Sequence, residues 1–125
     1  MDLERKSKRL LNLLIVDDNA RVRRLIAEIM TPIAKEIREC ADGGDALAAY
    51  DALQPDMVLM DVRMPRVDGI EATKRIRTAH PAAKVMIVSD LDDDALRLAA
   101  QKAGACGYAL KDNLLDLPGI VETLA

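Results

Sequence analysis

Two short apolar runs of the sequence end in aspartate side chains. Residues 13–16 lead directly into Asp17 and Asp18, and residues 57–60 lead into Asp61. Uncharged runs of this length, rich in branched residues, are typical of strands buried on both faces of a parallel sheet. Open α/β sheets bind their ligands at the carboxyl ends of such strands. These three carboxylates are therefore predicted to form a site rather than part of a core.

Three carboxylates that converge on one sheet edge repel one another unless a cation neutralises them or one of them stays protonated. Neither histidine nor cysteine accompanies Asp17, Asp18 and Asp61 in the sequence. A ligand set made only of oxygen atoms favours a hard divalent ion, Mg²⁺ above all, over zinc. We therefore expect a magnesium site at this edge.

Two later strand-like runs end in groups of complementary chemistry. Residues 84–88 lead to Ser89, and residues 105–110 lead to Lys111. A hydroxyl can donate a hydrogen bond to a phosphoryl oxygen, and an ammonium group can neutralise its charge. Phosphoryl transfer depends on positioning and charge neutralisation more than on covalent help from the protein. Together with the carboxylates, these side chains could hold a transferring phosphoryl group.

Strand-like and helix-like segments alternate along the chain, and these segments must position the side chains. This alternation predicts a doubly wound α/β fold with five parallel strands. The remaining strand is expected near residues 36–40. Asn19 can cap a helix that ends before Pro32, with Arg23 on its outer face. Further helices are expected around residues 46–53 and at about 70–79, 93–103 and 120–125. The helix at 93–103 is predicted to have a weak apolar stripe rich in small residues, namely Ala95, Leu98, Ala99 and Ala103.

Composition limits the class of protein. The chain has 125 residues, of which 50% are hydrophobic and 31% charged, as expected for one soluble domain. We assign residues 1–11 to an N-terminal extension, whose basic stretch at residues 5–9 is interpreted as a solubilising tail, and residues 12–125 to the domain. A net charge of -3 argues against a broad basic surface for nucleic acid, so any DNA contact requires another domain.

Cys40 and Cys106 are too few for a disulfide framework and do not have metal-ligand spacing. They are predicted to be reduced, buried thiols of a cytoplasmic protein. No apolar run is long enough to span a membrane. His80, the only histidine, is expected to be a solvated loop residue, so the chain is not its own histidine kinase.

The sequence resembles the receiver domain of two-component response regulators over about residues 12–125. The residues that carry the resemblance occur in order at the expected spacing: Asp17-Asp18, Asp61, Met64-Pro65, Asp68-Gly69, Ser89, and Gly107-Tyr108 with Lys111. The resemblance implies a flavodoxin-like (βα)5 receiver fold. It also implies a phosphoacceptor regulator that at most catalyses its own phosphorylation and dephosphorylation, and that is otherwise not an enzyme.

The resemblance implies a role for each matching residue. Asp61 would be the phosphoacceptor and would take its phosphoryl group from a phosphohistidine of a sensor histidine kinase. Asp18 and Asp61 would ligate Mg²⁺ directly, Asp17 would act mainly through bound water, and the backbone carbonyl of Arg63 would be a further ligand. These assignments agree with the magnesium site expected from the carboxylates alone.

The resemblance also implies a two-state switch. Ser89 would hydrogen-bond the phosphoryl group and move inward, Lys111 would pair with the same group, and Tyr108 would fill the space that Ser89 leaves. We hypothesise that phosphorylation of Asp61 shifts a weak homodimerisation equilibrium through the surface containing Tyr108. Residues 107–112 are similar to those of receivers that precede a helix-turn-helix domain, which implies regulation of transcription through a separate output domain.

Alternative functions remain open at this stage. A phosphatase with an aspartate nucleophile needs a second carboxylate two residues on, where this chain has Arg63. A flavodoxin-like cofactor binder would need a phosphate loop rich in Gly, Ser or Thr at the position of Asp17 and Asp18. A degenerate receiver would dock a partner without phosphorylation. Asp90 keeps this last alternative open, because the family usually has a small residue there and a carboxylate is expected to hinder entry or repel phosphate.

Overall fold

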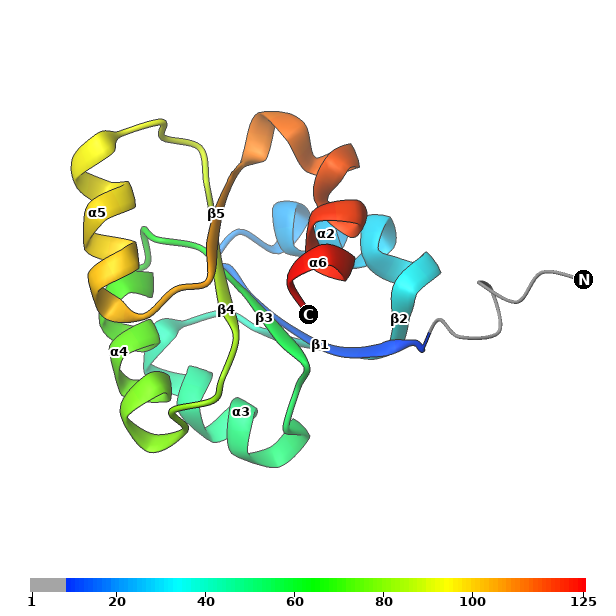
Figure 1. Cartoon of the computed structure of the whole chain (residues 1–125), viewed down its shortest axis with the longest axis horizontal. Helices are drawn as coiled ribbons and strands as arrows, with labels where there is room; N and C mark the ends of the chain where they lie inside the picture. Colours follow the sequence, from blue (N-terminus) through cyan, green and yellow to red (C-terminus); the bar gives the residue numbers. More distant parts are fainter. Residues whose placement is uncertain (1–8) are drawn as a thin grey trace, which may run out of the picture.

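Five parallel strands form one sheet in the order β2-β1-β3-β4-β5 in the computed structural model, which describes residues 9–125 (Figure 1). The strands are β1 (Leu11–Val16), β2 (Ala34–Cys40), β3 (Met57–Met60), β4 (Val85–Ser89) and β5 (Gly107–Leu110). The predicted five-stranded parallel α/β fold is confirmed. β1 begins one residue before the predicted domain boundary at residue 12. Most of the basic stretch at residues 5–9 lies outside the described residues.

Helices connect the strands and cover both faces of the sheet (Figure 1). They are α2 (Ala20–Met30), α3 (Ala46–Leu53), α4 (Gly69–Ala79), α5 (Asp94–Ala103) and α6 (Leu117–Leu124), with short 3-10 helices η1 (Thr31–Ile33), η2 (Gly43–Asp45) and η3 (Lys111–Asp116). Among residues 9–125, none of these helices has the length and apolar character needed to cross a membrane.

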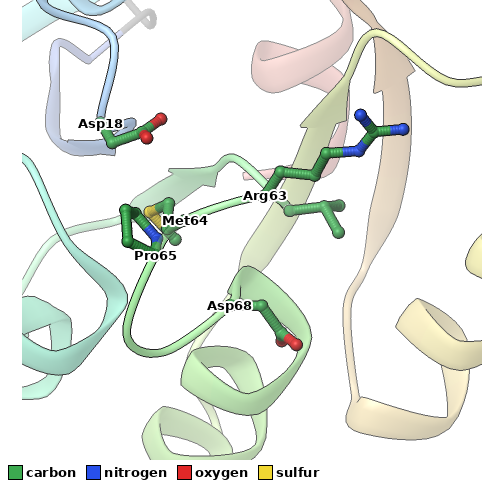
Figure 2. A pocket seen from close by; sticks show the side chains of 6 residues that line it. Asp18, Arg63, Met64, Pro65 and Asp68 are labelled. Carbon is green, nitrogen blue, oxygen red and sulfur yellow. The ribbon is translucent and has the colours of Figure 1, made fainter.

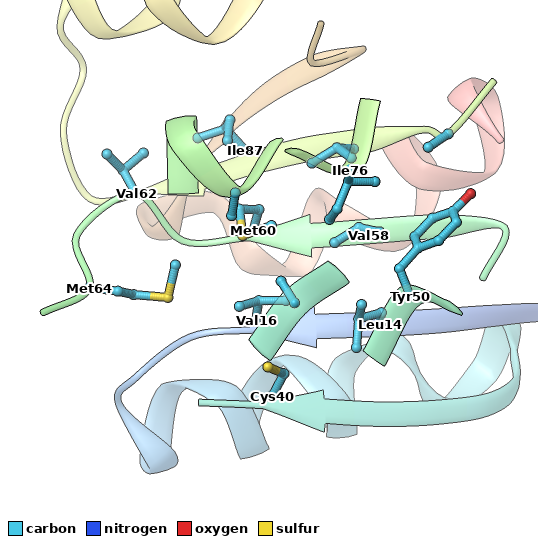
Figure 3. Close-up of a cluster of buried hydrophobic side chains, with 14 of the residues drawn as sticks. Leu14, Val16, Cys40, Tyr50, Val58, Met60, Val62, Met64, Ile76 and Ile87 are labelled. Atoms are coloured by element: carbon cyan, nitrogen blue, oxygen red, sulfur yellow. The ribbon is translucent and has the colours of Figure 1, made fainter. Parts of the chain in front are cut away.

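Alternation along the central strands divides the core into two layers. On one face, Leu14 and Val16 of β1 pack with Val58 and Met60 of β3 under α3, α4 and α5, and Tyr50 closes this cluster (Figure 3). On the other face, the intervening residues pack against α2 and α6, and they are Leu13, Ile15, Met57, Leu59, Met86 and Val88. Since both faces are covered, β3 and β4 contain only buried apolar residues until β4 reaches Ser89 at its end.

The expected start of α2 is confirmed. The Asn19 side chain accepts hydrogen bonds from the backbone N–H groups of Arg21 and Val22, at 3.0 and 3.1 Å. Asp68 and Asp93 cap α4 and α5 in the same way. A capping side chain satisfies backbone donors that the first helical turn leaves free, and such a cap stabilises a helix by about 1 kcal/mol.

Two helices differ from their predictions. In α5, Ala103 is buried as predicted, together with Ala100, whereas Ala95 is exposed and Leu98 is 51% exposed, so the first half of the predicted stripe faces solvent. The last helix begins at Leu117 rather than near residue 120. Pro118 lies in the first turn of α6, where proline sacrifices no intrahelical hydrogen bond.

The predictions for a thiol and for the histidine also need correction. Cys40 is buried, as predicted, but Cys106 is exposed beside the edge strand β5. His80 is half-buried rather than fully solvated. Its Nε2 lies 2.6 Å from Asp51 Oδ1, and its ring centroid lies 4.6 Å from that of Tyr50. His80 therefore links the end of α4 to α3.

Candidate functional site

The ends of β1 and β3 bring three carboxylates together. Asp17, Asp18 and Asp61 each offer a carboxylate oxygen, and these oxygens lie within 4.8 Å of one another. Val16 and Met60 are register partners in the parallel pair, and the Asp61 N–H donates to the Val16 carbonyl at 2.8 Å. Asp17 is 1% exposed and Asp61 is 7% exposed, whereas Asp18 is exposed. The register of the sheet therefore positions the acids predicted from the sequence.

Lys111 joins this cluster from the end of β5. Its Nζ donates a hydrogen bond to Asp61 Oδ1 at 2.9 Å and lies 3.0 Å from Asp17 Oδ2. The second contact is an ion pair whose angles do not form a hydrogen bond, so the buried Asp17 Oδ2 has no hydrogen-bond donor. One ammonium group thus neutralises only part of the charge of three carboxylates.

The environment changes the pKa of both partners in the Lys111–Asp61 pair. Burial raises the pKa of Asp61 above the ordinary aspartate value, and the nearby Asp17 adds to this effect, while Lys111 opposes it. Burial works against the charged form of Lys111, but its hydrogen bond to Asp61 and its ion pairing with Asp61 and Asp17 raise the pKa of the ammonium group. Lys111 therefore stays cationic, and the pKa of Asp61 lies above that of an ordinary aspartate.

Backbone and side-chain contacts hold Asp17 in place. Its Oδ1 accepts from the Asn19 N–H at 2.8 Å, and its own N–H donates to the Cys40 carbonyl at 3.0 Å. Arg23 Nη1 donates to the Asp17 carbonyl at 2.7 Å, while Arg23 Nε pairs with Glu39 at 2.9 Å. The sequence predicts Arg23 on the outer face of its helix but not these two contacts. The acidic residue Glu39 near the end of β2 is the only sequence signal that an arginine could form an ion pair at this place.

The backbone of Leu91 joins Ser89 and Tyr108. Ser89 is buried at the end of β4, and its Oγ accepts from the Leu91 N–H at 3.1 Å. Tyr108 is half-buried in β5, and its hydroxyl donates to the Leu91 carbonyl at 2.7 Å. The residues that line the cleft around Asp61 do not include either side chain.

The cleft over the carboxylates has a volume of about 400 Å³. Its lining residues are Asp17, Asp18, Asn19, Val22, Asp61, Arg63, Asp90 and Lys111. The carboxylate of Asp90, which follows Ser89, thus belongs to the same cleft as Asp61. Arg63 also lines a second hollow of about 450 Å³, where Figure 2 shows Met64 and Pro65 below Asp18 and the Arg63 side chain pointing away from them.

The loop that follows Asp61 is anchored at its end. Asp68 caps α4 by accepting from the Glu71 N–H at 2.8 Å, and the Gly69 N–H donates to the Val62 carbonyl at 2.8 Å. A Cβ atom added to Gly69 would lie 1.9 Å from the Asp61 carbonyl oxygen. The sequence Asp68-Gly69 thus combines a helix cap with a close approach to the backbone of the candidate phosphoacceptor.

Residues 13–122 match the family described as the response regulator receiver domain. The chain is 31% identical to the transcriptional regulatory protein DegU of Brevibacillus brevis over 123 residues, which are 97% of this chain and 51% of DegU. It is 38% identical to the chemotaxis protein CheY of Thermotoga maritima over 99 residues, which are 78% of this chain and 82% of CheY. The chain spans about half the length of several transcriptional relatives, whereas it matches most of CheY.

Solved structures show the same fold. A LuxR-family two-component response regulator from Aurantimonas sp. SI85-9A1 superposes with a TM-score of 0.86 at 33% identity, covering 91% of this chain and 84% of that one. The response regulator domain of Thermotoga maritima CheB superposes with a TM-score of 0.85 at 28% identity, covering 93% and 96% of the two chains. The (βα)5 fold predicted from the sequence is thereby confirmed.

Proposed function

The chain belongs to the response regulator receiver family, and we propose that it works as the phosphoacceptor switch of a two-component system, with Asp61 as the acceptor. The observation that carries this proposal is the buried position of Asp61 at the end of β3, within hydrogen-bonding distance of Lys111 and beside two further carboxylates. A carboxylate in such a site can attack a phosphoryl group while the surrounding charges hold the transferring oxygens.

Receiver domains bind Mg²⁺ at an acidic pocket, and the residues of this chain fit that ion. The donor set consists of carboxylate oxygens, and the buried Asp17 Oδ2 lacks a hydrogen-bond donor. Asp18 and Asp61 would hold the ion directly, Asp17 through water, and the backbone carbonyl of Arg63 would complete the protein ligands. Bound Mg²⁺ would supply positive charge for the phosphoryl oxygens.

The remaining roles belong to side chains of this chain. The Asp61 carboxylate would attack phosphorus, the bond from phosphorus to the donor would break, and the acyl phosphate would form. Lys111, which now donates to Asp61, would pair with a phosphoryl oxygen. The Ser89 hydroxyl would move to donate to another oxygen, as the two-state switch requires.

The partners follow from the same proposal. A sensor histidine kinase would supply the phosphoryl group, and phosphorylation would shift a weak homodimerisation equilibrium through the surface around Tyr108. Relatives such as DegU are named transcriptional regulators, and the aligned LuxR-family response regulator suggests the same class of output. We therefore propose that DNA is contacted only through a separate helix-turn-helix domain. Arg63 stands where an aspartate-nucleophile phosphatase would need its acid, which favours the switch over that enzyme.

Incubation with a small phosphodonor and Mg²⁺ is expected to add one phosphoryl group to the protein, because Asp61 offers one acceptor. Chelation of the metal should prevent the addition, since three clustered carboxylates otherwise repel an anionic donor. Intact mass spectrometry measures both results. Absence of the phosphoryl increment, while a known receiver is labelled under the same conditions, would instead support docking without phosphorylation.

Asp90 is expected to slow phosphorylation by small anionic donors, since its carboxylate lines the same cleft as Asp61. Both Asp90→Asn and Asp90→Ala should raise the initial rate of labelling by acetyl phosphate about threefold, and the gain should shrink in high salt. The asparagine variant keeps the size of the side chain and therefore isolates its charge. A gain in Asp90→Ala alone would assign the effect to steric hindrance, and no gain in either variant would contradict the prediction.

A further inference from the structure

Three cationic side chains surround a hollow between two helices. Helices α4 and α5 lie side by side on one face of the sheet (Figure 1). The hollow between their C-terminal parts has a volume of about 410 Å³ and is lined by Lys74, Arg77, Thr78, Lys102, Ala103 and Gly104. This basic hollow has three positive charges and no acidic side chain in its lining, on a chain whose net charge is -3.

No carboxylate in the described part of the chain neutralises these cations. The ion pairs among residues 9–125 do not include Lys74, Arg77 or Lys102. Glu71 lies three residues before Lys74 in α4 but pairs with Arg75 at 3.3 Å. The helix dipole favours Arg77 and Lys102, which lie in the last turns of α4 and α5, whereas Lys74 lies before the last turn. A bound anion would therefore supply the missing negative charge.

The position of Arg77 is fixed by its neighbours. Its Nη1 donates to the Ala83 carbonyl at 3.2 Å and also to the Pro81 carbonyl. Gly104 ends α5 with a φ of 101°, and a Cβ atom added to it would lie 2.7 Å from Arg77 Nε. The absence of a side chain at Gly104 thus leaves room for the arginine. A cation that is held in place before the ligand arrives loses less conformational entropy on binding.

Thr78 adds a hydroxyl group that its own helix does not use. The hydroxyls of Thr31, Thr73 and Thr123 each donate to the backbone carbonyl four residues earlier. The Thr78 hydroxyl makes no hydrogen bond to any group of residues 9–125, and Thr78 lines the basic hollow. A hydroxyl, two ammonium groups and a guanidinium group can all donate hydrogen bonds to an oxyanion.

We propose that the basic hollow is a binding site for a phosphate group. A phosphate monoester has about two negative charges at neutral pH and several acceptor oxygens, which suits donors that come from two helices. A single carboxylate would leave two of the three cations without a counter-charge. Arg77 contacts the Ala83 carbonyl just before β4, whereas Asp61 follows β3, so the hollow lies at the opposite edge of the sheet and leaves Asp61 accessible.

The test is a titration with inorganic phosphate without added Mg²⁺, followed by the amide signals in ¹H–¹⁵N NMR spectra. Saturable shifts are expected at Lys102 and Gly104, and Lys102→Gln should raise the half-saturating phosphate concentration about threefold, the size expected for one exposed ion pair. Lys74→Gln should have the same effect, and the double variant should raise the concentration about tenfold. Lys35→Gln removes the same charge from β2, at the far edge of the sheet, and should leave it unchanged.

Adenosine monophosphate, titrated in parallel, identifies the source of the phosphate group. A lower half-saturating concentration than that of inorganic phosphate would identify a nucleotide, and an equal or higher one would identify free phosphate. Absence of saturable shifts at Lys102 and Gly104 in the wild type would overturn the proposal. Equal losses in Lys35→Gln and Lys102→Gln would also overturn it, because they would show an effect of net charge alone. Binding of a polyglutamate peptide without binding of phosphate would assign the hollow to an acidic protein segment instead.

Discussion

Replacement of Asp61 by asparagine is expected to lower phosphorylation at least about 100-fold, because the amide oxygen is a poor nucleophile and the site offers no substitute in the same position. Asp17 is buried and already fixed by the Asn19 N–H and the Lys111 ion pair. Asp18 is exposed and lies in the loop after β1, whereas Asp61 follows β3. Initial rates from intact mass spectrometry, with acetyl phosphate and Mg²⁺, measure the loss.

Asp68→Asn is the matched control for this variant. It makes the same chemical change seven residues away, at the start of α4, and asparagine can still accept the hydrogen bond from the Glu71 N–H. Labelling of Asp68→Asn at the wild-type rate, together with its loss in Asp61→Asn, would assign the acceptor. Equal labelling of Asp61→Asn and wild type would show that another side chain takes the phosphoryl group.

The convergence of the acids could be predicted because it depends on only two features of the sequence. Apolar runs without charge indicate buried parallel strands, and such strands end at a common edge. Asp17 and Asp61 directly follow their apolar runs. The two side chains therefore lie close together whenever β1 and β3 pair in this register, as they do. Lys111 follows the same rule at the end of β5, although nothing in the sequence gives its distance from Asp61.

The buried face of α5 and the long-range contacts of the arginines could not be predicted, because they depend on tertiary packing that local sequence patterns do not encode. The small residues of α5 allow several faces to look apolar, so the predicted stripe included the exposed Ala95 and Leu98 while the helix buries Ala100. Arg23 reaches Asp17 and Glu39 only because α2 lies beside the end of β2. Likewise, no periodic pattern in the sequence predicts that Arg97 contacts Tyr108 and Asp92.

Gly69→Ala is expected to lower the free energy of unfolding by about 3 kcal/mol, because the new methyl group meets backbone that cannot rotate away. The added Cβ would lie 1.9 Å from the Asp61 carbonyl oxygen and 2.9 Å from the Met60 side chain. Relief requires that α4 move away from the end of β3, which would stretch the hydrogen bond from the Gly69 N–H to the Val62 carbonyl. Urea unfolding followed by far-UV circular dichroism measures the change.

Gly119→Ala is the matched control, and it is expected to raise the free energy of unfolding rather than lower it. Gly119 is exposed in α6, and a Cβ atom there would meet no atom within 4 Å. Alanine restricts the unfolded chain more than glycine does, so this variant should be more stable than wild type by about 0.5 to 1 kcal/mol. Equal effects of the two substitutions would show that the approach of Gly69 to Asp61 is not as close as described. A loss of stability confined to Gly69→Ala, together with weaker Mg²⁺ binding, would show that the glycine lets α4 begin directly against the backbone of Asp61.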